Sequence, residues 1–163
     1  MKNSNTTLYV IFGVILAVGA LYVFFQSDGD SRKAASLIGE EAEAATVYYS
    51  TTCGCCVNYL SYLRNVGFSV DAKSVQNIES IKNEYGIPYE MSSCHTSVIG
   101  GYVIEGHMPV VAIEKLLEEK PDIKGIALPE MPMGSPGMGG KKSENWTIYS
   151  LEKNGSVSVF MEL

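Results

Sequence analysis

The chain has 163 residues and a formal net charge of −6 at pH 7; 46% of its residues are hydrophobic and 18% are charged. This length fits one domain with accessory segments, and the composition excludes a disordered acidic tail and a repeat array. An acidic chain lacks the basic face that binds phosphates, so we expect no nucleic-acid partner.

The first segment is apolar and long enough to span a membrane. Residues 8–25 contain no charged or strongly polar side chain, and a helix of that length covers about 27 Å, close to the thickness of a bilayer's hydrocarbon core. A cleaved signal peptide would have a shorter apolar region that ends in small residues, whereas this one ends in Phe24 and Phe25. We therefore expect residues 1–7 in the cytoplasm, a single anchor at 8–25, and the remainder outside, in the periplasm or at the cell surface.

A change of composition follows the apolar segment. Residues 26–45 are rich in small and charged side chains and show little apolar periodicity, which is typical of a tether. The folded domain is then expected over residues 46–163, a length that buries a hydrophobic core without the help of disulfides.

The first half of this domain predicts a βαβ unit followed by a helix. A strand is expected at residues 46–50, where β-branched and aromatic side chains follow one another. A helix is expected over residues 57–66, because apolar side chains recur at helical spacing until Gly67 ends the pattern. A second strand is expected at 68–71 and a second helix at 78–85.

The second half predicts a ββα unit and a further hairpin. Residues 98–104 are expected to form a hairpin, because two adjacent glycines allow the positive φ angles of its turn. Pro109 suits the first turn of a third helix. A loop rich in Pro, Gly and Met follows at 128–140, and an Asn-Gly pair predicts a last hairpin at 146–161. This order, with cysteines at the first strand-to-helix turn, predicts a thioredoxin-like α/β fold with a mixed sheet and an extra C-terminal hairpin.

All four cysteines and both histidines lie within a window of 55 residues. Three of the cysteines lie where the first strand is followed by the first helix, so the N-terminus of that helix can stabilise a thiolate and lower its pKa. A thiolate is both the nucleophile of disulfide exchange and a ligand of soft metals. The six residues are Cys53, Cys55, Cys56, Cys94, His95 and His107.

Three interpretations of these residues compete. Cys53 and Cys56 can form a redox-active C-x-x-C pair, or the sulfurs and imidazoles can bind a metal. The third interpretation is a set of structural disulfides, in which a full pairing has to include Cys94 because Cys55 and Cys56 are adjacent. Neither disulfide-based interpretation explains why both histidines lie in the same window, and this favours a metal.

The methionines favour copper among the metals. Three of them lie in a segment whose Pro and Gly residues exclude regular structure, so packing in a core explains them poorly. Thioethers and thiolates together favour Cu(I), whereas zinc sites use Cys, His and carboxylates without Met. The alternative is that this loop simply covers a hydrophobic patch. The three residues are Met131, Met133 and Met138.

Four motifs of the sequence resemble those of domain-of-unknown-function family 411. They are residues 53–56 (CGCC), 93–96 (SCHT), 100–107 (GGYVIEGH) and 131–138 (MPMGSPGM). The resemblance covers nearly the whole predicted exterior domain. It implies a thioredoxin-like fold and a role with copper or a related soft metal, because members of this family are small secreted or periplasmic proteins regarded as metal binding. The departure is at the N-terminus, where the family often has a cleavable leader and this chain has an apparent anchor.

We therefore expect a membrane-anchored, extracytoplasmic protein that binds copper as Cu(I) for copper handling or resistance and exchanges it with a donor or acceptor protein. Cys53 and Cys56 are expected to supply the first thiolates, with Cys55 or Cys94 as a third. The histidines would complete the site and the methionines would form a lid or a transfer site. The expected ligands are Cys53, Cys55, Cys56, Cys94, His95, His107, Met131, Met133 and Met138.

Two other functions remain as alternatives. One is a thiol–disulfide oxidoreductase, in which Cys53 attacks a substrate and Cys56 resolves the mixed disulfide. The other is a domain whose Cys and His residues hold a purely structural zinc ion.

Overall fold

The computed structural model of the protein describes residues 42–163. The predicted cytoplasmic N-terminus, the anchor at residues 8–25 and the tether as far as residue 41 lie outside the described residues. Within residues 42–163, no helix has the length and apolar character needed to cross a membrane.

The predicted βαβ unit consists of β1 (Ala44–Ser50), α2 (Gly54–Asn65) and β2 (Ser69–Val75). β1 begins two residues before the expected strand because Ala44 and Ala45 already pair with β2. α2 begins three residues before the expected helix, so that two of the cysteines lie in its first turn. Its buried residues recur at the spacing of one helical face. They are Cys56, Tyr59, Leu60 and Leu63.

The next elements also follow the predicted order. Asn77 caps α3 (Ile78–Glu84), where its side chain accepts hydrogen bonds from the N–H groups of Glu79 and Ser80. A short 3-10 turn, η1 (Tyr89–Met91), leads to β3 (His95–Ile99) and β4 (Tyr102–Glu105). The hairpin turn between them contains Gly100 and Gly101, with φ angles of 56° and 82°, as the two glycines predict. Pro109 is the N-cap of α4 (Val110–Glu119).

The C-terminal part contains one strand that the sequence pattern does not predict. β5 (Gly125–Ala127) has three residues, all buried, and so short a run gives no periodicity to recognise. Gly125 is required there, because a Cβ atom would lie 1.8 Å from the carbonyl oxygen of Val103. The last hairpin is formed by β6 (Thr147–Leu151) and β7 (Val157–Glu162), as expected.

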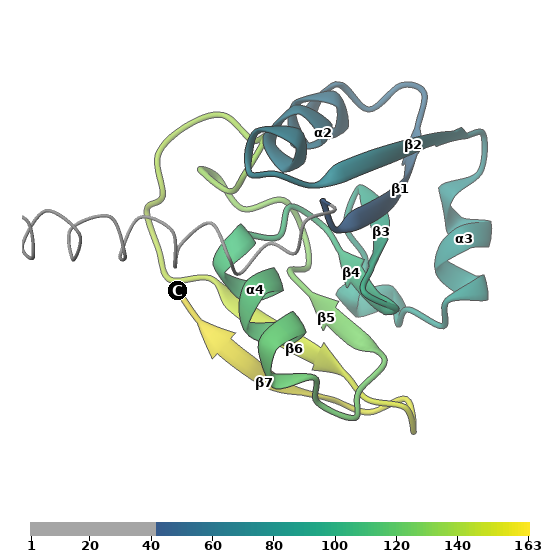
Figure 1. The fold of residues 1–163 in the computed structure, drawn as a ribbon, viewed down its shortest axis with the longest axis vertical. Helices are drawn as coiled ribbons and strands as arrows, with labels where there is room; N and C mark the ends of the chain where they lie inside the picture. The colour runs from purple at the N-terminus through teal and green to yellow at the C-terminus, as the bar shows by residue number, and fades with distance from the viewer. Residues whose placement is uncertain (1–41) are drawn as a thin grey trace, which may run out of the picture. The chain divides into compact units, whose positions relative to one another are not determined.

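The seven strands found in residues 42–163 belong to one mixed sheet in the order β2-β1-β3-β4-β5-β6-β7 (Figure 1). The pairs β1–β2 and β4–β5 are parallel, and the other four are antiparallel. The mixed α/β architecture and the extra C-terminal hairpin are therefore confirmed.

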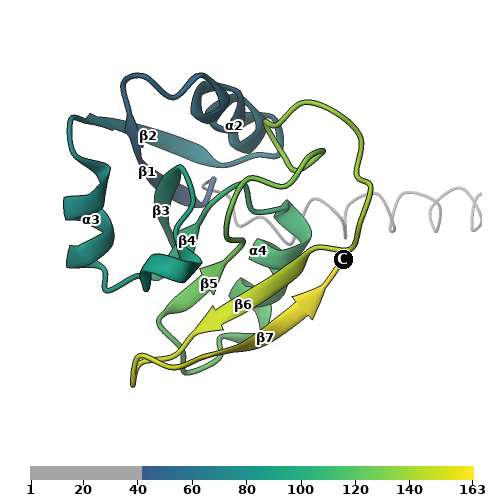
Figure 2. The same cartoon turned by 180° about the vertical axis from the view of Figure 1, so that it is seen from behind.

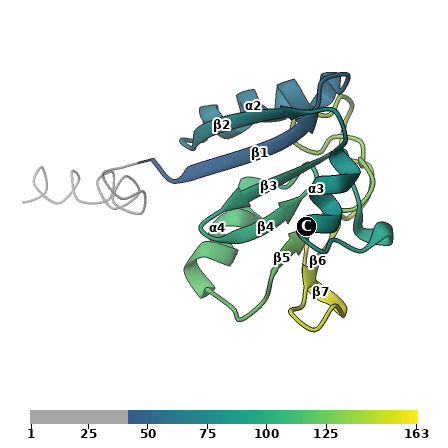
Figure 3. The same ribbon diagram turned by 90° about the vertical axis from the view of Figure 1, so that its right-hand side faces the viewer.

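The two faces of the sheet are covered by different helices. α2 and α4 share one face, because Leu63 and Ile113 belong to the same buried cluster. Side chains alternate along β4, so that Ile104 joins this cluster while Val103 joins a smaller one with Ile87. Figures 2 and 3 show α3 on the opposite side of the sheet from α4. The cysteines at the start of α2 therefore lie on the face that α2 and α4 cover.

Candidate metal centre

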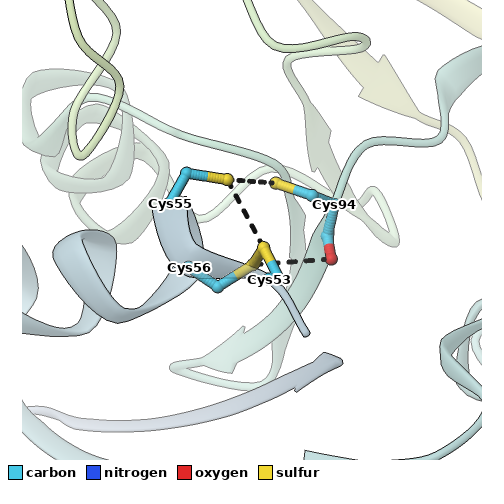
Figure 4. Close-up of side chains that lie close together, drawn as sticks. All are labelled: Cys53, Cys55, Cys56 and Cys94. Atoms are coloured by element: carbon cyan, nitrogen blue, oxygen red, sulfur yellow. Dashed lines mark hydrogen bonds between the residues drawn. A yellow bond between two sulfur atoms is a disulfide. The ribbon is translucent and has the colours of Figure 1, made fainter. Parts of the chain in front are cut away.

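The N-terminus of α2 places three cysteines next to Cys94, which immediately precedes β3. Cys53 and Cys56 form a disulfide, and Cys55 and Cys94 are free thiols. Cys53 Sγ lies 3.4 Å from Cys55 Sγ, and Cys55 Sγ lies 3.8 Å from Cys94 Sγ (Figure 4). The sulfurs of all four cysteines therefore meet at one point between α2 and β3.

The disulfide changes the expected order of the ligands. The sequence interpretation gives Cys53 and Cys56 as the first thiolates, but here they are bonded to each other. Their positions explain the bond, since the N-cap residue and the third residue of the helix have Cα atoms 5.4 Å apart. The thiols free to bind a metal in this state are the two that the sequence gives as alternatives for the third ligand.

Cys94 also contacts both imidazoles. Its Sγ lies 2.8 Å from His107 Nε2 and 3.5 Å from His95 Nδ1. His107 Nδ1 lies 2.6 Å from the carbonyl oxygen of Pro136. A carbonyl only accepts, so Nδ1 carries the proton and donates, which leaves the lone pair of the neutral imidazole on Nε2. His107 thus presents a ligand atom directly to the sulfur of Cys94.

His95 is the most deeply buried of the donors. It is 0% exposed, and its Nε2 has no hydrogen-bond partner among the described residues. An unpartnered buried nitrogen carries a free-energy cost that a bound ligand can offset. Both histidines, together with Cys94, therefore fit a site that gains from binding a metal.

Tyr59 holds the two imidazoles and was missed by the sequence interpretation. Its ring centroid lies 4.4 Å from that of His95 and 5.5 Å from that of His107, and its hydroxyl donates to the carbonyl of Met108 at 3.1 Å. Burial raises the pKa of this phenol. The available signal was its position one helical turn after Cys56, but an aromatic residue at that spacing is ordinarily assigned to a core.

Burial also shifts the pKa values of the cysteine and the two histidines that form the second group of donors. It raises the pKa of the Cys94 thiol to about 12, with a further increase from the nearby Cys55. Burial lowers the pKa of both His95 and His107. At neutral pH the thiol of Cys94 is therefore protonated and donates to a neutral His107, and a metal that binds this sulfur has to displace a proton.

The methionine-containing loop, residues 128–140, covers the site through its backbone. The carbonyl of Pro136 accepts from His107, and the carbonyl of Gly137 accepts from Asn58 Nδ2 at 3.3 Å. The side chains of Met131 and Met133 are 47% and 60% exposed, and Met138 is half-buried. The role of the three methionines as ligands stays a prediction.

The donor atoms form two groups that share Cys94. In each group the ligand atoms lie within 4.8 Å of one another. One group contains only sulfur, and the other combines one sulfur with two imidazoles. Soft donors of this kind fit Cu(I), and thiolate with imidazole also fits Zn²⁺. The groups are Cys53, Cys55, Cys56 and Cys94, and Cys94, His95 and His107.

Comparisons with known proteins identify the family of this chain. The family model described as "Protein of unknown function, DUF411" matches residues 91–138. Two solved structures of copper resistance protein copG are each 39% identical in sequence to this chain. The match to Form 2 has a TM-score of 0.70 and covers 76% of this chain and 99% of that structure's chain. The match to Form 1 has a TM-score of 0.69 and covers 76% of this chain and 98% of that structure's chain. The curated proteins contain no match. The chain therefore belongs to the DUF411 family, as the motifs of its sequence predict.

Proposed function

We propose that this protein is a membrane-anchored, extracytoplasmic Cu(I)-binding protein that takes part in copper handling or resistance. The observation that carries the proposal is the position of Cys94, whose sulfur lies 3.8 Å from Cys55 Sγ and 2.8 Å from His107 Nε2. Cys94 thus has a second free thiol on one side and an imidazole with a free lone pair on the other, and it belongs to both groups of candidate ligands. Thiolate sulfur is a ligand that favours Cu(I), and imidazole also binds copper. The copper resistance proteins that share the fold support the choice of copper.

The fold and the location belong to the same proposal. Strands β2-β1-β3-β4, with α2 and α4 on one face and α3 on the other, support a thioredoxin-like domain. The apolar segment at residues 8–25 supports an anchor, and a donor or acceptor protein would meet the domain outside the cytoplasm. The exposed thioethers of Met131 and Met133 offer a weak copper site for that transfer.

The redox state of Cys53 and Cys56 determines how many thiols of the centre can bind Cu(I). When a dithiol reduces the Cys53–Cys56 bond, two electrons and two protons convert it into two thiols, and the dithiol becomes a disulfide. Four thiol sulfurs then replace the two that are free in the structure. The reduced protein should therefore bind more Cu(I) than the disulfide form.

An anaerobic Cu(I) titration of the full chain in detergent tests the proposal, with a chromophoric Cu(I) chelator as competitor. The disulfide form should retain copper against the chelator, and the dithiol-reduced form should retain more. The matched control is the double variant Cys55→Ser/Cys94→Ser, which has no free thiol while the disulfide is intact. If the chelator removes copper equally well from wild type and from this variant, copper does not bind at these cysteines.

The disulfide itself favours thiol–disulfide oxidoreduction as a second candidate. Cys53 is partly exposed at the N-cap of α2 while Cys56 is buried, as expected for an attacking and a resolving cysteine. The Cys53 thiolate would attack a substrate disulfide, and the Cys56 thiolate would then displace the substrate as a dithiol and restore the Cys53–Cys56 bond. Metal-free, dithiol-dependent reduction of insulin that Cys53→Ser abolishes would support this activity; no reduction above the uncatalysed rate would exclude it.

A further inference from the structure

A buried carboxylate lies behind the candidate metal centre. Glu105 is the last residue of β4 and is 0% exposed. It forms an ion pair with Lys82 of α3, which is 1% exposed. Neither residue belongs to the two groups of candidate ligands.

Each oxygen of this carboxylate accepts hydrogen bonds. Oε1 accepts from the ammonium group of Lys82 and, at 2.7 Å, from the backbone N–H of Ser93. Oε2 accepts from the hydroxyl of Thr96 at 2.6 Å. Ser93 and Thr96 are the first and last residues of the SCHT motif, so one carboxylate is bonded to both ends of the segment that carries Cys94 and His95.

The carboxylate of Glu105 lies on the face of the sheet opposite to the candidate metal centre. Successive side chains of β3 point to opposite faces, and His95 contacts Tyr59 of α2 whereas Thr96 contacts Glu105, which is bonded to α3. A second backbone contact, from the N–H of Gly106 to the carbonyl of His95 at 3.0 Å, joins the segment to the residue before His107. Glu105 therefore contacts the segment that carries Cys94 and His95, and it lies outside both groups of candidate ligands.

Stability alone explains this ion pair poorly. Taking two charges out of water carries a desolvation cost, and replacement of a buried ion pair by apolar residues of similar size is often neutral or stabilising. A carboxylate that accepts three hydrogen bonds does, however, fix the groups that donate them. Groups that orient metal ligands in this way contribute to metal affinity without binding the metal.

We propose that Glu105, held in place by Lys82, is a positioning residue that fixes residues 93–96 and thereby sets Cys94 and His95 for metal binding. This inference rests on the proposed function. It assigns a role to two charged residues that are far apart in sequence from the cysteines of α2, and it gives α3 a part in the metal centre.

The test uses two sets of variants of the full chain. Glu105→Gln alone leaves Lys82 buried without a counter-charge and can unfold the protein, so the double variant Lys82→Met/Glu105→Gln removes both charges together. The second set compares Thr96→Val, which removes the hydroxyl, with Thr96→Ser, which keeps it. The matched control is Lys115→Met/Glu119→Gln, which removes the ion pair on the exposed surface of α4.

The first measurement needs no metal. Hydrogen–deuterium exchange at the Ser93 amide should be about ten-fold faster or more in the Lys82/Glu105 variant than in wild type, because its acceptor is weakened. The second measurement is Cu(I) affinity, which should fall by about 10- to 100-fold in that variant and in Thr96→Val. The thiolate-to-copper absorption should change in parallel, and Thr96→Ser and the surface control should match wild type.

The outcomes separate this inference from the proposed function. If wild type binds no Cu(I), the proposed function fails, and the role of Glu105 in metal binding fails with it. If wild type binds Cu(I), and the folded double variant matches it in affinity, absorption and Ser93 exchange, the positioning role alone is wrong. If the double variant does not fold, the Thr96 pair decides: equal affinities of the Val and Ser variants would overturn the inference.

Discussion

At the scale of single residues, the centre depends most on Cys94. Its sulfur is the one atom shared by the all-sulfur group and the group with two imidazoles. It stays free when Cys53 and Cys56 are bonded to each other. From the sequence alone, Cys94 ranks below those two cysteines, because a C-x-x-C spacing is visible in a sequence. The distance from Cys94 to His107 is instead set by the pairing of β3 with β4.

Replacement of Cys94 should therefore cost more copper affinity than replacement of Cys55. Since loss of a group that only orients a ligand already costs about 10- to 100-fold in affinity, we expect Cys94→Ser to lower Cu(I) affinity by about 100-fold or more. Cys55→Ser removes a donor from one group only and should have a smaller effect. Competition with a Cu(I) chelator measures both, and equal losses in the two variants would contradict the shared role of Cys94.

The lowered pKa values of the two histidines predict how the stability of the folded protein depends on pH. Burial lowers both imidazole pKa values in the folded protein, so below the unfolded value of about 6.5 the unfolded chain binds more protons than the folded one. The metal-free protein should thus lose stability as the pH falls from 7 to 5, by up to about 1.4 kcal/mol per pH unit for each histidine. Thermal unfolding followed by circular dichroism measures this loss.

The variant His107→Gln provides the comparison for this prediction. It removes one of the two titrating imidazoles, so the loss of stability between pH 7 and pH 5 should be smaller than in wild type. A wild-type melting temperature that stays constant or rises over the same range would contradict the prediction.

At the scale of elements, the sequence predicts the positions of most helices and strands but not their ends. The hairpins follow from Gly-Gly and Asn-Gly turns, whose positive φ angles few other residues adopt. α2 begins earlier than its apolar pattern because Gly54 and Cys55 give no hydrophobic signal. β5 is missed because three residues are too few for a pattern, and its existence depends on pairing with β4 and β6.

The loop at residues 128–140 is the element whose contacts are most easily tested. Gly137 has a φ angle of 81°, and a Cβ atom there would lie 2.7 Å from the backbone nitrogen of Tyr59. Gly137→Ala should therefore push the loop away from α2, cost about 1–3 kcal/mol in free energy of unfolding, and weaken the contact between Pro136 and His107. Urea unfolding and Cu(I) affinity should both report the change.

Gly139→Ala is the matched control for this loop. A Cβ atom at Gly139 meets nothing within 4 Å, and its φ is not positive. The change should alter the free energy of unfolding by less than about 0.5 kcal/mol. If Gly137→Ala is equally harmless, the loop does not hold the site in the way that its contacts indicate.

At the scale of the whole molecule, the candidate donors are predictable but the groups that orient them are not. The clustering of Cys and His within 55 residues is visible in the sequence, and the fold brings all six side chains together. Tyr59 and Lys82 lie in no motif, and Glu105 lies in one (residues 100–107) without a sign of its role. In a sequence, an aromatic residue that orients ligands looks like a core residue, and a buried ion pair looks like two surface charges. Their roles follow only from tertiary contacts across both faces of the sheet.

The solved relatives and the chemistry of the donors both bear on which metal this centre binds. The solved relatives are copper resistance proteins, with 39% sequence identity, and the centre offers soft donors partly buried behind a loop. Two of the four cysteine sulfurs are bonded to each other in the disulfide, so the number of thiols available to a metal depends on the redox state of the centre. A structural site would instead need its ligands to stay reduced.

X-ray absorption at the copper edge of the anaerobically Cu(I)-loaded, full-length protein measures which atoms bind the copper. Copper bound at this centre should have a first coordination shell dominated by sulfur, with a nitrogen contribution. That nitrogen contribution should decrease in His107→Ala, and the sulfur contribution should decrease in Cys94→Ser. A first shell of oxygen and nitrogen alone, or a spectrum that neither variant changes, would contradict Cu(I) binding at this centre.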